Sequence, residues 1–277
     1  MQHSSSTAEA QPIKAPTISF LGGGRITSAL IAGLRLAGDR REIVVHDRNL
    51  AKTKRLHLEL RTKVAGNLRD TIEHAQIVVI AVRPASVIGL LDEISKSAAT
   101  PRLCVSLAAG IPLTILRAAL PMTRWVRAMP SPVCRVGKGL TALCFDQTVN
   151  KKDRAVVREF FQKVGQVVEV PEQQFDAFTA TYSSSHGYHA LAALATAAQR
   201  AGLDPDTALT AAAHALADGI QYWRESGLTL DELLHEAATP GGIAAATVTA
   251  MDKAGYGRSV QKGLAAGISQ ARRNAKP

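Results

Sequence analysis

The sequence predicts an α/β protein in which a doubly wound, largely parallel β-sheet is followed by an all-helical domain. Short runs of Ile, Val and Leu alternate along residues 16–170 with segments of helical periodicity, which is typical of a parallel sheet with helices on both faces. A glycine turn at residues 22–24 joins the first apolar run to the first helical segment. After Pro171 the apolar runs end, and alanine-rich helical segments fill residues 171–277. We therefore expect two domains that meet at Pro171, preceded by a disordered tail at residues 1–15.

The glycine turn and its surroundings predict an anion-binding site. An apolar strand at Ile18–Leu21 runs into the motif G-x-G-x-x-T at residues 22–27. Glycines let the backbone approach a pyrophosphate, and the N-terminus of a helix attracts negative charge. The third glycine position holds Thr27, and the motif by itself is equally consistent with a simple tight turn. The context favours a dinucleotide, because a second strand at residues 42–46 ends at Asp47, where such folds place the residue that contacts the ribose.

The other elements of the α/β domain follow from the same alternation. The continuous run Ile77–Val82 marks a strand buried on both faces, and Asn49 and Asn67 are suited to cap helices. The remaining expected segments are helices at 26–37, 50–59, 68–74 and 152–164 and strands at 63–65, 103–107, 124–127, 139–145 (at an edge of the sheet) and 167–170. Ligands of such sheets bind at the carboxyl ends of the strands, which here carry Gly, Pro or polar residues at 22–25, 47–48, 83–84 and 109–110.

The helical half is predicted from its caps and its apolar face. We expect one helix over residues 172–201, a helix from Pro205 to a stop at Gly227, and helices over 230–237, 243–253 and 258–273. Thr229 and Glu232 have the spacing of a capping box. One face of the helix after Pro205 carries Leu209, Ala212, Ala213, Leu216, Ile220 and Trp223. Broad apolar faces on alanine-rich helices favour an intertwined homodimer.

Composition excludes several classes of function. The net charge is +10, but the basic residues are dispersed and aromatic residues are few, so we expect no nucleic-acid binding. No apolar run is long enough to cross a membrane. The three cysteines, Cys104, Cys134 and Cys144, form no CxxC pair, and the polar start of the chain has no signal-peptide pattern, so we expect a cytoplasmic protein with structural thiols. No metal site is expected.

Six motifs, in this order and at fitting spacings, resemble those of pyrroline-5-carboxylate reductases. They are the glycine turn, Ala81–Pro84, Ser106–Ile111, Val126–Ser131, Asp176–Ala180 and Thr239–Gly242. The resemblance covers nearly the whole chain after the tail. It implies a Rossmann-type dinucleotide-binding domain, a helical dimerisation domain, and reduction of a cyclic imino acid, the precursor of proline, with a nicotinamide cofactor.

The resemblance also implies which residues bind the cofactor. The pyrophosphate would lie on Gly22, Gly24, Arg25 and Ile26, the adenosine and its ribose beside Asn67, Ala81, Val82, Arg83 and Pro84, and the nicotinamide ribose near Ala109, Gly110, Met129 and Pro130. The family usually has Lys at the position of Arg83 and Asn at the position of Ser131.

The residues after the second strand lead to opposite expectations for the cofactor. Asp47 would accept a hydrogen bond from a ribose 2′-hydroxyl and repel a 2′-phosphate, whereas Arg48 and Lys52 would attract that phosphate. Arg48 and Lys52 are equally consistent with an exposed helix start. Because the family has Arg at the position of Arg48, we expect NADPH, with NADH as the alternative.

The substrate half departs from the family. The family's Ser-Gly-Ser-Gly-Pro-Ala-Tyr stretch aligns with residues 182–188, where only Ser184 and Tyr188 remain. The Thr that the family is thought to use to hydrogen-bond or protonate the imine nitrogen is replaced by Ala244. We therefore expect a reshaped pocket, with the substrate held by Ser185, His189, Thr239, Gly241 and Gly242.

The segment 182–189 offers replacement donors. On a continuous helix, Tyr182, Ser185 and His189 would share one face, and His186 would lie near it. Tyr and His can donate a proton, so we expect Tyr182 and His186, with Ser184, to be the catalytic residues. The alternative is that this face belongs to a dimer interface or a hydrogen-bonded core.

Three functions remain open from the sequence. The first is an NAD(P)H-dependent reductase of a cyclic imine or imino acid. The second is a cofactor-binding relative without reductase turnover, which the loss of Thr at Ala244 favours. The third is a carbonyl reductase or dehydrogenase that uses Tyr182 or His186 as its acid.

Overall fold

The computed structural model describes residues 17–73, 75–97 and 99–274, so the tail expected at residues 1–15 lies outside the described part. The chain divides into two compact units. One is built from the chain up to Phe175 together with the chain from Arg272 onward, and the other from Asp176–Ala271.

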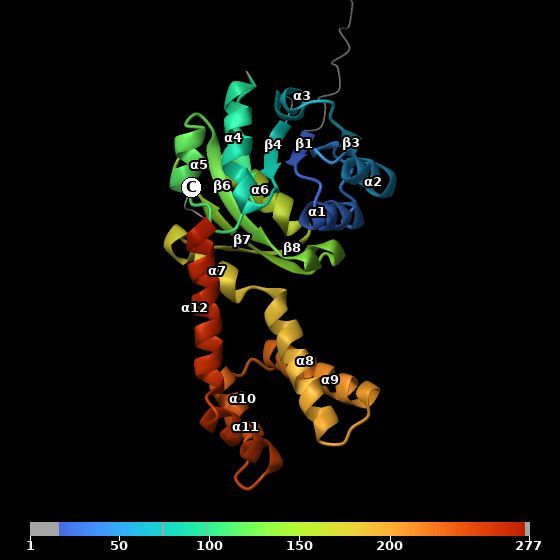
Figure 1. The fold of residues 1–277 in the computed structure, drawn as a ribbon, viewed down its shortest axis with the longest axis vertical. Coiled ribbons are helices and arrows are strands. Elements are labelled where there is room, and N and C mark those ends of the chain that lie inside the picture. Colours follow the sequence, from blue (N-terminus) through green and yellow to red (C-terminus); the bar gives the residue numbers. More distant parts are fainter. Residues whose placement is uncertain (1–16, 74, 98, 275–277) are drawn as a thin grey trace, which may run out of the picture. The chain divides into compact units, whose positions relative to one another are not determined.

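The first unit contains a single sheet, which in the described part of the chain has eight strands in the order β3-β2-β1-β4-β5-β6-β7-β8 (Figure 1). The strands are β1 (Thr17–Leu21), β2 (Ile43–His46), β3 (Lys63–Val64), β4 (Ala75–Ile80), β5 (Leu103–Ser106), β6 (Arg124–Pro130), β7 (Gly139–Phe145) and β8 (Gly165–Glu169). Neighbours from β3 through β6 are parallel, which confirms the predicted doubly wound sheet.

The prediction that residues 139–145 form an edge strand was wrong. β7 pairs antiparallel with β6 and parallel with β8, so β8 is the strand at the edge. This pairing depends on a close approach of two glycines, because a Cβ on Gly165 would lie 1.9 Å from the carbonyl oxygen of Gly139. Such a long-range contact leaves no periodicity signal in the sequence.

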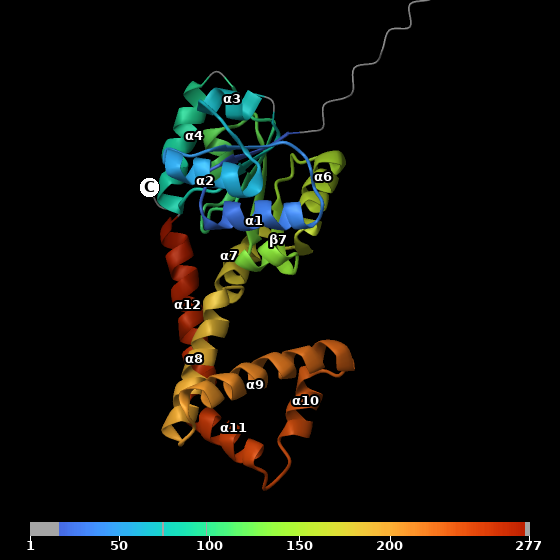
Figure 2. The same ribbon diagram turned by 90° about the vertical axis from the view of Figure 1, so that its right-hand side faces the viewer.

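Helices cover both faces of the sheet, and Figure 2 shows the strands between α4 and α6. The helices of this unit are α1 (Arg25–Leu36), α2 (Leu50–Leu60), α3 (Leu68–Glu73), α4 (Val87–Lys96), α5 (Leu113–Ala119), α6 (Lys151–Gln162) and the start of α7 (Glu172–Thr181), with 3-10 turns at Pro84–Ser86 and Pro132–Val136. The core lies where α1 and α6 meet the sheet. There Phe20 of β1 packs on Phe160 of α6 with ring centroids 6.4 Å apart.

Side-chain caps begin several helices where the sequence predicts them. The Asn49 side chain accepts from the backbone N–H of Ala51 at 3.0 Å, and the Asn67 side chain accepts from that of Asp70 at 2.8 Å. In the second unit Asp204 caps α9, and Thr229 and Glu232 form the complete capping box of α10. These confirmed boundaries position the loops at the carboxyl ends of the strands.

The second unit is helical. It contains the rest of α7, then α8 (Ser184–Arg200), α9 (Pro205–Ser226), α10 (Leu230–Ala237), α11 (Ile243–Lys253) and most of α12 (Tyr256–Asn274). Apolar side chains along α9 are strongly exposed, including Leu209 at 51%, Ile220 at 52% and Trp223 at 47%. The predicted apolar face is therefore present but largely uncovered within one chain. None of the described helices is both long and apolar enough to cross a membrane.

The prediction of one helix over residues 172–201 was also wrong. The chain leaves the helix after Thr181, and Ser183 takes an extended conformation (φ −110°, ψ 123°) before α8 begins at Ser184. Serines favour N-cap positions over helix interiors, because their hydroxyls compete for backbone hydrogen bonds. Tyr182 therefore lies in the break, and the argument that it shares a helical face with Ser185 and His189 fails.

Asp39 joins the end of α1 to the end of α6. Its buried carboxylate accepts from the backbone N–H of Arg41 at 2.9 Å and from the Lys163 ammonium at 3.1 Å. Burial by itself would raise the pKa of Asp39, but the hydrogen bonds from Arg41 and Lys163 outweigh it and hold the pKa far below its usual range.

We expect Asp39→Asn to lower the free energy of unfolding by about 2 kcal/mol near neutral pH, because two cations would lose a charged partner. Urea denaturation measures this difference. A carboxylate with a depressed pKa stabilises the fold above its unfolded-state pKa, and that contribution is lost as pH falls through its folded-state pKa. The difference between the two proteins should therefore persist at pH 5 and shrink only in strong acid. An unchanged unfolding free energy near neutral pH would contradict this role.

Candidate functional site

The glycine turn lies at the carboxyl end of β1, between β2 and β4. The backbone N–H of Gly22 donates to the carbonyl of His46 at 2.8 Å, and that of Ala81 donates to the carbonyl of Leu21 at 2.8 Å. Gly22 has φ +111°, and a Cβ there would lie 2.6 Å from the carbonyl oxygen of Ala81. A side chain at position 22 is thus excluded both by the backbone conformation and by contact with Ala81 at the end of β4.

Thr27 holds the turn from the position where many dinucleotide folds have a third glycine. Its buried hydroxyl donates to the carbonyl of Gly22 at 2.7 Å. At Gly24 an added Cβ would meet nothing within 4 Å, and no side chain caps the N-terminus of α1. The N-terminus of α1 therefore begins at an uncrowded glycine and has no side-chain cap, as an anion site requires.

Asp47 is tied to the glycine turn. One carboxylate oxygen accepts from the backbone N–H of Gly23 at 2.8 Å and contacts the Lys52 ammonium at 3.3 Å, and the other accepts from the N–H of Asn49 at 2.8 Å. Burial opposes ionisation of Asp47, but these hydrogen bonds and the Lys52 charge outweigh it, so the pKa lies below its usual range. The neighbouring Arg48 points elsewhere and forms an ion pair with Glu93 of α4.

The other residues expected at the cofactor also lie at the carboxyl ends of the strands. Ala81, Val82, Arg83 and Pro84 follow β4, and Met129 and Pro130 end β6. Asn67 follows β3 and uses its side chain to cap α3. The Ala109-Gly110 turn follows β5, with Gly110 at φ +78° and the Ala109 carbonyl accepting from the Asn274 side chain at 3.3 Å. The carboxyl ends of the parallel strands β1 to β6 thus lie at the same end of the sheet.

The residues expected at the substrate and at the acid lie in the second unit. Tyr182 lies in the break after α7, with its ring centroid 5.5 Å from that of Phe178. Nε2 of His186 lies 2.7 Å from the carbonyl oxygen of Ala180, so it carries the proton of that hydrogen bond and leaves Nδ1 for other partners. Ser184 is the first residue of α8.

The remaining substrate candidates have separate positions within the second unit. The Ser185 hydroxyl is 2.6 Å from that of Ser183, and His189 is exposed one turn further along α8. The turn between α10 and α11 contains Thr239, Gly241 and Gly242. The N–H of Gly242 donates to the carbonyl of Thr239 at 2.9 Å, and Gly241 has φ +79°.

Among the described residues no cluster of three or more His, Cys, Asp or Glu could hold a metal ion.

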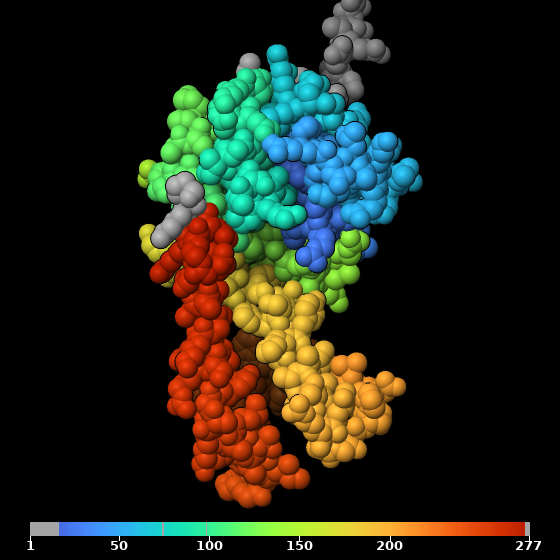
Figure 3. Space-filling view, viewed as in Figure 1, coloured from blue at the N-terminus to red at the C-terminus, as the bar shows by residue number. Residues whose placement is uncertain are grey.

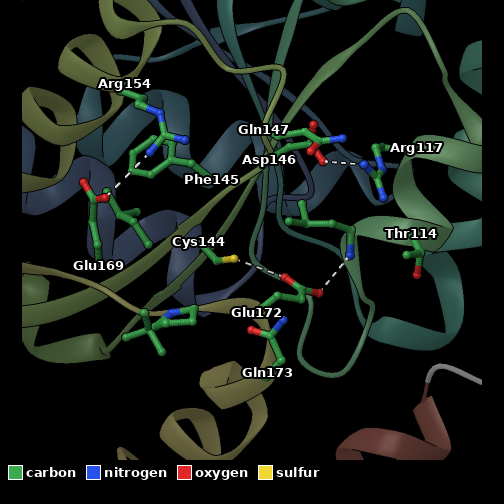
Figure 4. A pocket seen from close by; sticks show the side chains of 14 residues that line it. Thr114, Arg117, Cys144, Phe145, Asp146, Gln147, Arg154, Glu169, Glu172 and Gln173 are labelled. Carbon is green, nitrogen blue, oxygen red and sulfur yellow. Dashed lines mark hydrogen bonds and ion pairs between the residues drawn. The ribbon is translucent and has the colours of Figure 1, made fainter.

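Sequence reasoning missed a polar hollow of about 590 Å³ between α5, β7, β8 and the start of α7 (Figure 4). At its floor Glu172 accepts from the backbone N–H of Leu113 at 3.0 Å, from Arg127 at 2.9 Å and from the Cys144 thiol at 3.1 Å. The guanidinium of Arg127 also lies 4.4 Å from the ring centroid of Phe175. One signal was available, since Arg127 is a charged residue inside an apolar strand.

The charges of this hollow are neutralised within it, which argues against a reactive centre. Arg117 pairs with Asp146 at 3.2 Å and Arg154 with Glu169 at 3.7 Å. Burial, together with the Glu172 carboxylate, raises the pKa of Cys144 to about 12, so its thiol is not a nucleophile near neutral pH. We interpret the hollow as a structural junction that holds the start of α5, and with it the turn after β5.

The comparisons with known proteins match both parts of the chain. Residues 17–110 match the family described as NADP oxidoreductase coenzyme F420-dependent, and residues 172–274 match the family described as pyrroline-5-carboxylate reductase dimerisation. The chain is 30% identical to a pyrroline-5-carboxylate reductase of Mycobacterium tuberculosis, with 91% of this chain and 95% of that protein covered. The enzyme of the same name from Mycobacterium leprae is 31% identical, with 86% and 90% covered.

Solved structures show the same fold. A pyrroline carboxylate reductase from Plasmodium falciparum with NADP bound superposes with a TM-score of 0.84 at 20% identity, covering 96% of this chain and all (100%) of that one. The pyrroline-5-carboxylate reductase of Coxiella burnetii gives a TM-score of 0.83 at 25% identity, covering 94% and 98%.

Replacing the Thr27 hydroxyl tests the glycine turn. Thr27→Val keeps the side-chain shape but leaves the buried carbonyl of Gly22 without this donor. An unsatisfied buried carbonyl costs about 1–3 kcal/mol of free energy, which destabilises the turn. We expect affinity for a nicotinamide dinucleotide, measured by isothermal titration calorimetry, to fall by about tenfold. Thr27→Ser retains the hydroxyl and is expected to bind as the wild type does. Equal affinities of the Val variant and the wild type would show that the hydroxyl does not hold the turn.

Proposed function

Because the chain belongs to the pyrroline-5-carboxylate reductase family, we propose that it is an NAD(P)H-dependent reductase that acts on the C=N bond of a cyclic imine or imino acid. The Mycobacterium tuberculosis relative that carries this name aligns with 91% of the chain at 30% identity. The observation that carries the proposal is the backbone geometry at Gly22, which excludes a side chain where a pyrophosphate must approach.

The residues of the first unit fit a nicotinamide dinucleotide. The N–H groups at the start of α1 would bind the pyrophosphate, and Gly22, Gly24, Arg25 and Ile26 would surround it. Asp47 and Arg48 lie at the end of β2, where the adenine ribose would bind, and the turns after β5 and β6 would flank the nicotinamide ribose. When bound, the reduced nicotinamide supplies the hydride that C=N reduction needs.

The protein must also supply a proton for the imine nitrogen, and we propose that the junction between α7 and α8 provides it. Ala244 has no donor, whereas Tyr182, Ser184 and His186 carry O–H or N–H groups at this junction. Nε2 of His186 is engaged with the carbonyl of Ala180, which orients the ring and leaves Nδ1 as the atom that can hold and release a proton. Ser185, His189 and the Thr239–Gly242 turn would shape the altered substrate pocket.

The helical unit supports a homodimer. Apolar side chains of α9 are about half exposed within one chain, and residues 172–274 match a dimerisation family. Exposed apolar faces of this kind mark association surfaces. We propose that two copies pair through these helices.

A second candidate is a relative that binds the cofactor without turnover. It is favoured by one observation, namely that Ala244 lacks the hydroxyl the family is thought to use. A carbonyl reductase that uses Tyr182 or His186 as its acid would differ from both in acting on ketones.

The central prediction is turnover with a cyclic imine. We expect the purified protein to oxidise NADPH in the presence of 1-pyrroline-5-carboxylate, 1-pyrroline or 1-piperideine-2-carboxylate, measured by the absorbance of the reduced nicotinamide. Turnover on the first compound would mean that another donor replaces the missing Thr. Binding of NADPH with no turnover on any of the three would favour the second candidate.

A second prediction concerns the proton donor. His186→Gln keeps an N–H group for the carbonyl of Ala180 but cannot deliver a proton from an imidazole, so we expect kcat to fall by about a hundredfold with KM nearly unchanged. His214, which is exposed on α9 and pairs with Asp218 at 3.1 Å, offers a matched control, and His214→Gln should retain wild-type kcat. A His186→Gln protein with wild-type kcat would assign the proton to another group, with Tyr182→Phe as the next variant.

A further inference from the structure

Arg48 is the cation that follows β2, and the structure pairs it with an acid from a distant helix. Its Nη2 contacts the Oε1 of Glu93, two turns into α4. Both side chains are accessible, with exposed fractions of 79% for Arg48 and 46% for Glu93. The surface of α2 (light blue) adjoins that of α4 (teal) in Figure 3. The pair therefore spans the surface of the first unit beside the end of β2.

The other charged residues of this segment are already engaged. Both carboxylate oxygens of Asp47 accept backbone hydrogen bonds, from Gly23 and from Asn49. The Lys52 ammonium lies 3.3 Å from Asp47 and offsets its charge. Asp47 thus supports the glycine turn, and Lys52 is held by it. Discrimination between a 2′-hydroxyl and a 2′-phosphate is left to Arg48.

The ion pair with Glu93 bears on how well Arg48 can distinguish a 2′-phosphate from a 2′-hydroxyl. A phosphate monoester carries about −1.5 to −2 charges at pH 7 and is well matched to a guanidinium. While Arg48 pairs with Glu93, the net charge of the two side chains is zero. A 2′-phosphate that binds Arg48 would have to displace the Glu93 carboxylate and would be repelled by its negative charge. A ribose 2′-hydroxyl carries no charge and meets no such competition.

We propose that Glu93 is a specificity-determining residue, which competes with the 2′-phosphate for Arg48 and thereby narrows the preference for NADPH over NADH. This inference rests on the proposed function, because it assigns a role in choosing the cofactor. Exposed ion pairs are weak, so Glu93 adjusts the affinity ratio by about two- to fivefold. The effect is electrostatic and decreases as salt is added.

The test compares dissociation constants for NADP⁺ and NAD⁺, measured by isothermal titration calorimetry at low ionic strength. We expect Glu93→Gln to bind NADP⁺ about two- to fivefold more tightly than the wild type, with NAD⁺ affinity unchanged. Asp92→Asn is the matched control, because it removes one negative charge from the neighbouring position, where Asp92 pairs with Lys96 at 2.6 Å. The control should leave the ratio of the two affinities at its wild-type value.

A double-mutant cycle separates this role from a general charge effect. Arg48→Gln should weaken NADP⁺ binding, and adding Glu93→Gln to that variant should change nothing further if Glu93 acts through Arg48. Equal tightening of NADP⁺ and NAD⁺, or the same shift in Asp92→Asn, would overturn the inference. A wild-type protein that binds neither dinucleotide would instead contradict the proposed function, so the two failures are distinguishable.

Discussion

The close approach of Gly22 to Ala81 is the constraint on which the candidate cofactor site depends. A Cβ at Gly22 would lie 2.6 Å from the Ala81 carbonyl oxygen, so the ends of β1 and β4 can meet only when this residue has no side chain. The turn is then held on three sides, by the His46 carbonyl, the Thr27 hydroxyl and the Asp47 carboxylate. Because these partners come from α1, from β2 and from the residue that follows β2, the turn that leads into α1 is held against the sheet. An anion site built from backbone in this way is preorganised before any ligand arrives.

A second carboxylate, Glu172, orders the other side of the first unit. It binds the first N–H of α5, the buried Arg127 of β6 and the Cys144 thiol of β7, so one side chain connects three elements distant in sequence. Removing one partner of such a buried charge leaves the other unpaired, which is the costly outcome. Since α5 begins at Leu113, shortly after the Ala109-Gly110 turn, this junction supports the loop where we propose that the nicotinamide ribose lies.

Locally encoded features could be predicted from the sequence, whereas features that depend on distant partners could not. The caps at Asn49 and Thr229 are readable because donor and acceptor are a few residues apart. The place of β7 inside the sheet depends on the contact of Gly139 with Gly165, and the role of Glu172 depends on Arg127. The break at Ser183 is intermediate, because a serine run favours an N-cap but the alanine-rich flanks favour one continuous helix. Helical periodicity alone therefore predicts that Tyr182 shares a helical face with Ser185 and His189, and the break at Ser183 separates Tyr182 from that face.

The two units differ in what their proposed roles require of the sequence. In the first unit the ligand would be bound largely by backbone groups, so only residues that permit the geometry, such as Gly22 and Thr27, are tightly constrained. In the second unit the proposed proton donor must be a particular side chain, because only a correctly placed O–H or N–H group can deliver a proton. The hydrogen bond from His186 to the carbonyl of Ala180 spans the break between α7 and α8. A side chain that closes such a break is oriented by it, and orientation of a titratable ring is what a positioned acid requires. The hydrogen bond to Ala180 thus holds the His186 ring in a defined direction, which the proposed role of this residue as an acid requires.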